Sequence, residues 1–273
     1  MPESVTRRLI SLLAGWLLTL TVQAQTLVLT GAETQGSLMR GKLPPGSQVW
    51  LNDQPIGTLA DGSFAFGFGR DAALTHTLRW TLPSGEQQSH EISLSAREYP
   101  TQRIEGVPQA MVTPPKSVLE RIKNDNWMVA KARKTNSDLR DFTVDFIWPA
   151  EGPITGVYGS QRVFNGVPKR PHFGVDVGAP TGTDVVAPAG GTITLAHADL
   201  YYSGGTIIID HGLGVNSTFL HLSQLNVSVG DRVEQGQKIG EIGATGRATG
   251  PHLDWRINWF SERLDPALLV PAR

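Results

Sequence analysis

The sequence predicts a mainly β protein with an N-terminal β-sandwich, a helical linker and a C-terminal antiparallel β domain. Short apolar runs separated by turn residues predict the two β domains, and a proline-led stretch between them has helical apolar spacing. Glycine and proline are numerous, at 30 and 18 of 273 residues, which is typical of a chain rich in strands and turns. We place the sandwich at residues 25–100, the linker at 101–147 and the C-terminal domain at 148–273.

Residues 1–24 have the features of a secretory signal peptide. Arg7 and Arg8 precede an apolar run over residues 9–22, and Val22-Gln23-Ala24 forms a small-residue cleavage site. The apolar run is short for a membrane span, although an uncleaved N-terminal anchor is the alternative. We therefore expect a cleaved signal peptide, export to the periplasm and no transmembrane segment in the mature protein.

The composition argues against several classes of protein. The 24 basic and 25 acidic side chains give a formal net charge of -1, and no basic run is present, so phosphate contacts with nucleic acid are not expected. The chain has no cysteine, which excludes disulfides and a lipid-modified N-terminal cysteine. An exported protein of a bacterial periplasm fits this composition better than a disulfide-stapled secreted protein.

The N-terminal domain is expected to consist of short strands. Turn residues such as Pro44-Pro45-Gly46 and Pro83-Ser84-Gly85 separate its apolar runs at the spacing of a small antiparallel sandwich. These runs lie at residues 27–29, 49–51, 64–66, 78–80 and 92–94. The domain contains no recognisable catalytic cluster.

A helix or broken helix is expected within residues 116–142, directly after Pro114-Pro115. The proline-led start and the spacing of apolar residues such as Val118 and Ile122 favour it. We interpret this stretch as a linker that docks the two domains. The further hypothesis that the upstream region covers an active-site groove has only its length in support.

The C-terminal domain is expected to be nearly all β. Glycine and proline turns cut it into short runs rich in β-branched residues, which is typical of strands joined by tight loops. The expected strands lie at residues 185–187, 191–194, 206–210, 217–221, 238–242 and 252–259.

Two short stretches of this domain carry metal-site chemistry. The segment from His172 to Asp176 is predicted to be a strand or a strand edge, in which alternate side chains share a face with Gly174 as a gap between them. His252 and Asp254 share a face in the same way. One imidazole and up to two carboxylates can therefore converge on a divalent ion, with a second imidazole beside it.

The same domain contains a series of motifs in a fixed order. They are Gly156 to Arg162, His172-Phe173-Gly174-Val175-Asp176, Ala187-Pro188-Ala189-Gly190-Gly191, Ile209-Asp210-His211-Gly212, Phe219-Leu220-His221-Leu222, Gly236 to Gly240, and Thr245 to Leu253. In this order they resemble the M23 family of zinc metallopeptidases, the LytM or lysostaphin-like endopeptidases that cut peptidoglycan cross-links. The resemblance covers about residues 148–266, and the number of ordered pieces makes it specific.

The resemblance implies a LytM-type fold and a site for one zinc ion. By position, His172 and Asp176 are implied as metal ligands, and His221 and His252 as catalytic residues that flank the attacking water. The family's third ligand is the second histidine of a His-x-His motif, and this chain has Asp254 there.

Asp254 is the departure on which the predicted function depends. An aspartate is a legitimate zinc ligand and lies on the correct face, so we predict that Asp254 completes the metal site. The alternative is that Asp254 pairs with its same-face neighbour Arg256 and leaves the site weak or empty. One histidine and two carboxylates would neutralise a dication, and the added oxygen ligand favours harder ions such as Mn²⁺ more than usual. Lower activity or an altered metal choice follows as a hypothesis.

The leading functional hypothesis is a periplasmic zinc metallo-endopeptidase that hydrolyses peptide cross-links of peptidoglycan. Its main rival is a non-catalytic LytM-type module that binds or activates a cell-wall amidase. Four of the five site positions match the family and the fifth keeps a group able to ligate, which favours the enzyme. Tyr158, Arg162, Asn165 and Tyr201 are candidates for lining the groove, although loop polarity alone would explain them.

Overall fold

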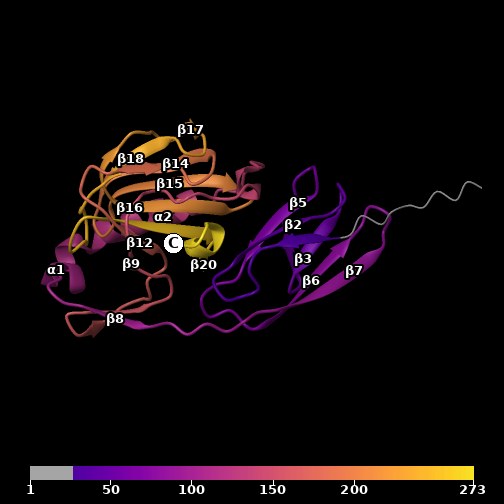
Figure 1. Ribbon diagram of the computed structural model, residues 1–273, viewed down its shortest axis with the longest axis horizontal. Coiled ribbons are helices and arrows are strands. Elements are labelled where there is room, and N and C mark those ends of the chain that lie inside the picture. Colours follow the sequence, from indigo (N-terminus) through magenta and orange to yellow (C-terminus); the bar gives the residue numbers. More distant parts are fainter. Residues whose placement is uncertain (1–26) are drawn as a thin grey trace, which may run out of the picture.

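The computed structural model describes residues 27–273, in which two β domains are joined by a partly helical linker (Figure 1). The predicted signal peptide lies outside these residues. The N-terminal domain has one sheet of order β1-β2-β5 and one of order β4-β3-β6-β7. The strands are β1 (Val28–Thr30), β2 (Leu38–Lys42), β3 (Gln48–Leu51), β4 (Gln54–Ile56), β5 (Ser63–Gly67), β6 (Thr75–Thr81) and β7 (Gln87–Ser93).

Alternation along β6 explains why the two sheets pack face to face. His76, Leu78 and Trp80 are buried, while the residues between them are exposed, as expected for a strand with one face toward a core. Phe64 and Phe66 of β5 meet these side chains from the other sheet and are completely buried. The predicted N-terminal sandwich is confirmed.

The linker runs along the C-terminal domain. Its first strand, β8 (Thr101–Ile104), pairs in parallel with β10 (Gln161–Phe164), so that Gln102 lies opposite Arg162. Val107 is held by two hydrogen bonds with the Asn165 side chain. The elements of this region are β8 (Thr101–Ile104), α1 (Gln109–Val112), η1 (Lys116–Val118), α2 (Leu119–Arg133), η2 (Asp141–Thr143), β10 (Gln161–Phe164) and β11 (Val167–Pro168).

The helical part of the linker is broken, as predicted, and its longest piece packs on the large sheet. Val129 and Ala132 of α2 contact Leu195 and Ile208, two apolar side chains of the C-terminal domain. Because the helix buries only this narrow stripe, most of its other side chains remain in solvent.

The C-terminal domain is built on a ten-stranded, antiparallel sheet. Its main path is β17-β14-β15-β16-β19-β12-β9, while β13, β18 and β20 pair at its sides. The strands are β9 (Ile154–Gly156), β12 (Val175–Gly178), β13 (Asp184–Val186), β14 (Gly191–Leu200), β15 (Gly204–Gly212), β16 (Val215–Leu225), β17 (Arg232–Val233), β18 (Lys238–Ile242), β19 (His252–Trp259) and β20 (Glu262–Leu264), followed by η3 (Pro266–Leu269).

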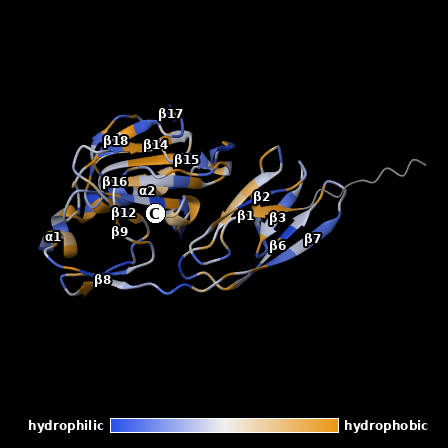
Figure 2. Cartoon of the chain, viewed as in Figure 1, coloured by the Kyte–Doolittle hydropathy of each residue, from blue (hydrophilic) through white to orange (hydrophobic). Residues whose placement is uncertain are grey.

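The middle of this sheet is covered on both faces. All nine residues of β15 are buried, and Trp255 of β19 and Phe219 of β16 are completely buried in the main core. Hydrophobic residues run along these strands in Figure 2, in keeping with burial of the sheet. The mainly β fold with a C-terminal antiparallel domain is therefore confirmed. In the part of the chain from residue 27 onward, no helix is long and apolar enough to cross a membrane.

Side chains of both domains meet at β20. Arg97 forms a 2.8 Å ion pair with Asp265, whose carboxylate is buried. The main-chain N–H of Asp265 donates to the carbonyl of Gly36 in the sandwich. Leu264 lies against Gly67 so closely that a β-carbon added there would come within 2.7 Å. The sandwich therefore packs directly against β20, the strand that pairs with β19.

A buried histidine at the end of β15 predicts how stability depends on pH. His211 contacts the carbonyl of Gly190 at 2.6 Å and the hydroxyl of Ser217 at 2.7 Å, and burial lowers its pKa to about 4. The unfolded imidazole titrates near 6.5, so between these values the unfolded state binds a proton that the folded state rejects. The contribution of neutral His211 to the unfolding free energy is therefore fully present above pH 6.5 and is lost as the pH decreases toward 4. At pH 5 the loss is about 2 kcal/mol.

We expect His211→Gln to remove about 2 kcal/mol of the difference in unfolding free energy between pH 7 and pH 5. Urea unfolding at both pH values measures this difference, and His197→Gln, at a partly exposed histidine, is the matched control. An equal loss of stability on acidification in wild type and His211→Gln would contradict the prediction.

Candidate metal centre

Three neighbouring strands bring the candidate site residues together. Asp254 of β19 lies opposite Leu220 on β16 and opposite Asp176 on β12. His252 lies opposite Gly178 on the same strand pair. Directly opposed residues of an antiparallel pair project on the same face, so the two aspartates point into one site.

His172 approaches the aspartates from the loop before β12, because this strand begins only at Val175. Its Nδ1 lies 3.3 Å from the carbonyl of Val157. Its Nε2 therefore faces the carboxylates, 3.0 Å from Asp176 Oδ1 and 3.4 Å from Asp254 Oδ2. All three side chains are buried.

These donors fit a divalent ion such as zinc. Ligand atoms at zinc-bond length in a tetrahedron lie about 3.3 Å apart, close to the 3.0 and 3.4 Å between His172 and the two carboxylates. His172 Nε2 and Asp176 Oδ1 are buried and face each other at 3.0 Å, and neither has a well-directed hydrogen bond to another described residue. A carbonyl at the other ring nitrogen is the usual support of a metal-binding histidine. The structure brings the predicted ligands together, and their binding of a metal stays a prediction.

Both carboxylates also have a guanidinium partner. Arg256 donates from Nε and Nη2 to the two oxygens of Asp254, at 2.8 and 2.5 Å. Arg162 donates from Nη2 to Asp176 Oδ2 at 2.5 Å. The ion pair between Asp254 and Arg256, which the sequence offered as the alternative, is therefore present, and Asp254 also faces His172. Metal ligation by Asp254 stays a prediction. Because the arginines offset the carboxylates, a bound dication would leave about two positive charges here, not the neutral centre expected from the sequence.

Neighbouring charges outweigh burial in setting the pKa values of the two aspartates and of His172. Burial would raise the pKa of Asp254, but Arg256 and His172 hold it well below its ordinary value. In Asp176, burial is likewise outweighed by His172, and the pKa is lowered. Burial disfavours the charged form of His172, yet the carboxylates raise its pKa. The space between the two aspartates therefore favours a positive charge.

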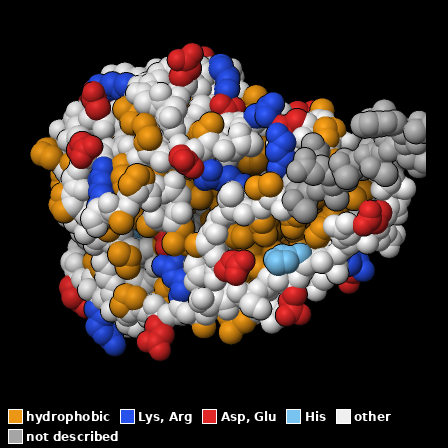
Figure 3. Space-filling model, turned by 45° about the vertical axis from the view of Figure 1, so that its right-hand side comes forward, with side chains coloured by type: hydrophobic (Ala, Val, Ile, Leu, Met, Phe, Trp, Pro, Cys, Tyr) orange, Lys and Arg blue, Asp and Glu red, His pale blue; other side chains and the backbone are white. Residues whose placement is uncertain are grey.

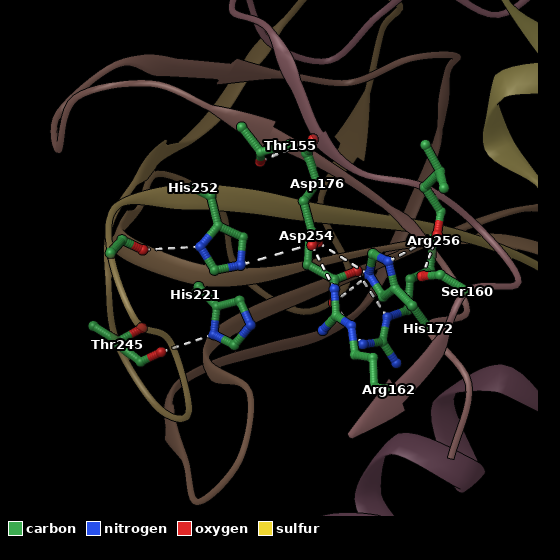
Figure 4. A network of polar contacts seen from close by, with 12 residues as sticks. Thr155, Ser160, Arg162, His172, Asp176, His221, Thr245, His252, Asp254 and Arg256 are labelled. Carbon is green, nitrogen blue, oxygen red and sulfur yellow. Dashed lines mark hydrogen bonds and ion pairs between the residues drawn. The ribbon is translucent and has the colours of Figure 1, made fainter. Parts of the chain in front are cut away.

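His221 and His252 lie on one side of the carboxylates, with Arg162 and Arg256 on the other (Figure 4). The ring centroids of the two histidines are 4.8 Å apart. His252 Nε2 lies 4.0 Å from Asp176 Oδ1, which places both rings at the edge of the metal-binding group.

Both of these histidines are oriented by main-chain carbonyls. His221 Nδ1 lies 2.8 Å from the carbonyl of Thr245, and His252 Nδ1 lies 2.9 Å from that of Gly250. Each Nδ1 therefore carries the proton, and each Nε2 is free to accept one. Burial lowers the pKa of His221 to about 4, so this ring is neutral at neutral pH.

The backbone of His221 is unusual for a strand residue. Its φ is 66°, in the left-handed region that non-glycine residues seldom occupy. The N–H donates to the carbonyl of Ser203 at 2.8 Å, which helps to hold this conformation. Such conformations cluster at functional sites, so the backbone supports the role predicted for His221 from the family motif.

Two glycines leave room for the two carboxylates. A β-carbon on Gly174 would lie 2.5 Å from Asp254 Oδ1, and one on Gly156 would lie 2.2 Å from Asp176 Oδ2. The gap predicted at Gly174 is therefore filled by the side chain of Asp254. Any larger residue at either position would displace a carboxylate.

Of the other candidate groove residues, Arg162 lines the site, while Tyr158 is buried and donates to the carbonyl of Arg263. Asn165 and Tyr201 bind the linker. Sequence reasoning missed Arg133 and Arg263, which line the same cavity as His172. No local signal marks them, because Arg133 comes from the linker helix and reaches the site only through tertiary packing.

Comparison with known proteins agrees with this geometry. A model of the family described as Peptidase family M23 matches residues 170–266. The chain is 39% identical over 87 residues to the peptidoglycan DD-endopeptidase ShyA of Vibrio cholerae, covering 32% of this chain and 20% of that protein. It is 31% identical over 132 residues to the cell division protein DipM of Caulobacter vibrioides, covering 46% of this chain and 21% of that protein. The chain spans about a fifth of the length of these curated relatives.

The likeness to solved structures extends beyond the C-terminal domain. A crystal structure of an M23-type protein from Pseudomonas aeruginosa has a TM-score of 0.67 and 25% identity, and the match covers 87% of this chain and 94% of that one. The C-terminal domain thus has the fold and the motifs of a LytM-type peptidase domain. The C-terminal domain belongs to peptidase family M23.

The two glycines give a test of the site geometry. We expect Gly174→Ala to reduce the affinity for Zn²⁺ by at least about tenfold, because the added methyl group overlaps Asp254 and the site must be held closely to bind metal. Titration of the metal-free protein with zinc against a competing chelator measures the affinity. Gly250→Ala is the matched control, since nothing lies within 4 Å of its added β-carbon although it neighbours His252. Equal zinc affinities in the two variants would refute the assignment.

Proposed function

We propose that the protein is a periplasmic metallo-endopeptidase that hydrolyses peptide cross-links of peptidoglycan, with one Zn²⁺ ion held by His172, Asp176 and Asp254. The observation that carries the proposal is the convergence of one imidazole and two carboxylates in a buried group beside two further imidazoles. Membership of a peptidase family and the peptidoglycan DD-endopeptidase named among the relatives support the substrate class. Export rests on the signal-peptide features of residues 1–24.

The metal would supply Lewis-acid chemistry, polarising the scissile carbonyl and acidifying nearby water. His221 and His252 present free Nε2 atoms toward the same space, and both rings are held by main-chain carbonyls. They are therefore placed to accept the proton of the attacking water and to return it to the leaving amine. Mn²⁺ is the alternative ion, because two of the three ligands are oxygen donors.

A second candidate function is favoured by the arginine pairs. Arg256 engages both oxygens of Asp254, and Arg162 engages Asp176, so both carboxylates have cationic partners without a metal. This arrangement would suit a non-catalytic LytM-type module that binds or activates a cell-wall amidase. The convergence of His172 with both carboxylates, at 3.0 and 3.4 Å, is the observation that keeps the enzyme as the first proposal.

Digestion of purified sacculi separates the two candidates. We expect the mature protein to release cleaved cross-linked peptides, and a chelator or His172→Ala to lower the rate at least about a hundredfold, because either change removes a metal–ligand interaction. Chromatography of the released peptides measures the rate, and elemental analysis of the purified protein identifies the ion.

His197→Ala is the matched control, because His197 lies on β14 and is not one of the residues of the site. Release that persists in the chelator and in His172→Ala would contradict the metal mechanism. Release that occurs only after an amidase is added would identify the non-catalytic module.

A further inference from the structure

A cavity of about 420 Å³ opens beside the metal-binding group and is strongly basic. Seven of its lining residues are arginine or lysine, and Asp254 is the acidic one among the described residues that line it. The outer surface differs, since Lys, Arg, Asp and Glu are mixed over the face seen in Figure 3. The excess of positive charge is therefore a local property of this cavity.

Some of these cations already have partners. Arg162 and Arg256 pair with the two site aspartates. Lys169 donates to the carbonyl of Val112 at 2.7 Å, and Arg247 stacks over the ring of Tyr202 at 4.5 Å. These four groups hold the walls of the cavity and do not by themselves call for a ligand.

Arg133 is different because it is buried without a carboxylate. It is 9% exposed, and it forms no ion pair within residues 27–273. Its Nη2 donates to the Thr218 hydroxyl at 3.1 Å, but its buried Nε has no partner. Thr218 lies opposite Arg256 in the β16–β19 register, so Arg133 reaches the wall directly beside the Asp254–Arg256 pair.

Arg263 approaches the same space from β20. Its guanidinium lies 5.7 Å from the ring of Phe173, the neighbour of His172, and it has no ion pair in the described part of the chain. Burial and then the nearby Arg256 lower its pKa to about 10, and burial followed by Arg263 and Arg256 lowers that of Arg133. Three guanidinium groups thus repel one another across one cavity wall.

Such an arrangement is costly unless an anion occupies the cavity, because a buried charge without a counter-charge is strongly unfavourable. A dication at the neighbouring aspartates would increase the excess of positive charge. Guanidinium groups bind carboxylates through two parallel hydrogen bonds, which gives both affinity and orientation.

We propose that Arg133 and Arg263 form a subsite for a free carboxylate of the peptide substrate, next to the position of the scissile bond. The proposal rests on the proposed function, because the peptides of peptidoglycan supply the carboxylate. Arg133 belongs to the linker helix α2, so the linker contributes a substrate-binding residue to the peptidase domain. Selection among peptides would then depend on an anionic group as well as on the bond that is cut.

Calorimetric titration with a synthetic stem pentapeptide tests the subsite. The full-length mature protein is kept in a chelator, so that binding is measured without turnover. Three forms of the peptide are compared: the free acid, the form with only the C-terminal carboxylate amidated, and the form with every carboxylate amidated. We expect the free acid to bind at least about tenfold more tightly than the fully amidated peptide, and the singly amidated form shows which carboxylate is bound.

Arg133→Met and Arg263→Gln should each reduce this preference to about twofold or less, whereas Arg232→Gln, at an exposed ion pair with Asp141, should keep it. Thermal unfolding distinguishes a ligand-binding arginine from one that only stabilises the fold, because removal of a stabilising arginine would lower the unfolding temperature. Arg133→Met should unfold at the same or a higher temperature, because it removes a buried charge that has no counter-charge.

Equal binding of the free acid and the fully amidated peptide to wild type would overturn the proposal, as would a preference that survives in every folded cavity variant. Binding of inorganic phosphate together with equal binding of all three peptides would indicate a phosphate site and would also overturn it. Preferential binding of the free acid without hydrolysis of sacculi would support the subsite and refute the proposed enzyme. Failure of the subsite can therefore be told apart from failure of the proposed function.

Discussion

Two carboxylates of like charge lie directly opposite each other on neighbouring buried strands, and the site is arranged around this repulsion. Asp176 and Asp254 are an opposed pair in the β12–β19 register, and both are buried. Like charges in such positions destabilise a sheet unless cations lie close to them. Here Arg256 pairs with Asp254 from the same strand and Arg162 pairs with Asp176, while the imidazole of His172 lies between the two carboxylates.

The need for cations beside the two aspartates connects the linker to the site in the C-terminal domain. Arg162 lies on β10, and β10 is paired with the linker strand β8. Arg133 comes from the end of α2, which packs against Leu195 and Ile208 of the large sheet. The linker therefore positions two of the arginines that surround the aspartates. It is a part of the site, and the sequence-based view of it as a docking segment was incomplete.

Local patterns in the sequence predicted most of the strands and the residues at the centre of the site. The predicted runs became β13, β14, β15, β16, β18 and β19, because burial of alternating side chains is encoded locally. β14 and β16 extend well beyond the predicted bounds, and the short strand β17 was not predicted. His172, Asp176, His221 and His252 were identified from motifs whose spacing is preserved. The arginine cluster could not be found this way, since Arg133, Arg162 and Arg263 meet only through pairings between distant segments. The sequence also posed ligation and ion pairing of Asp254 as alternatives, and the structure contains the ion pair, in which Arg256 engages both carboxylate oxygens.

The contact between the domains at β20 limits how this protein can exchange parts in evolution. Leu264 fits against Gly67, and the buried carboxylate of Asp265 is neutralised by Arg97 from the other domain. A different N-terminal module joined to the same peptidase domain would leave that carboxylate without its counter-charge and that leucine in water. The sandwich and the peptidase domain are therefore expected to be inherited together, as a single unit of descent.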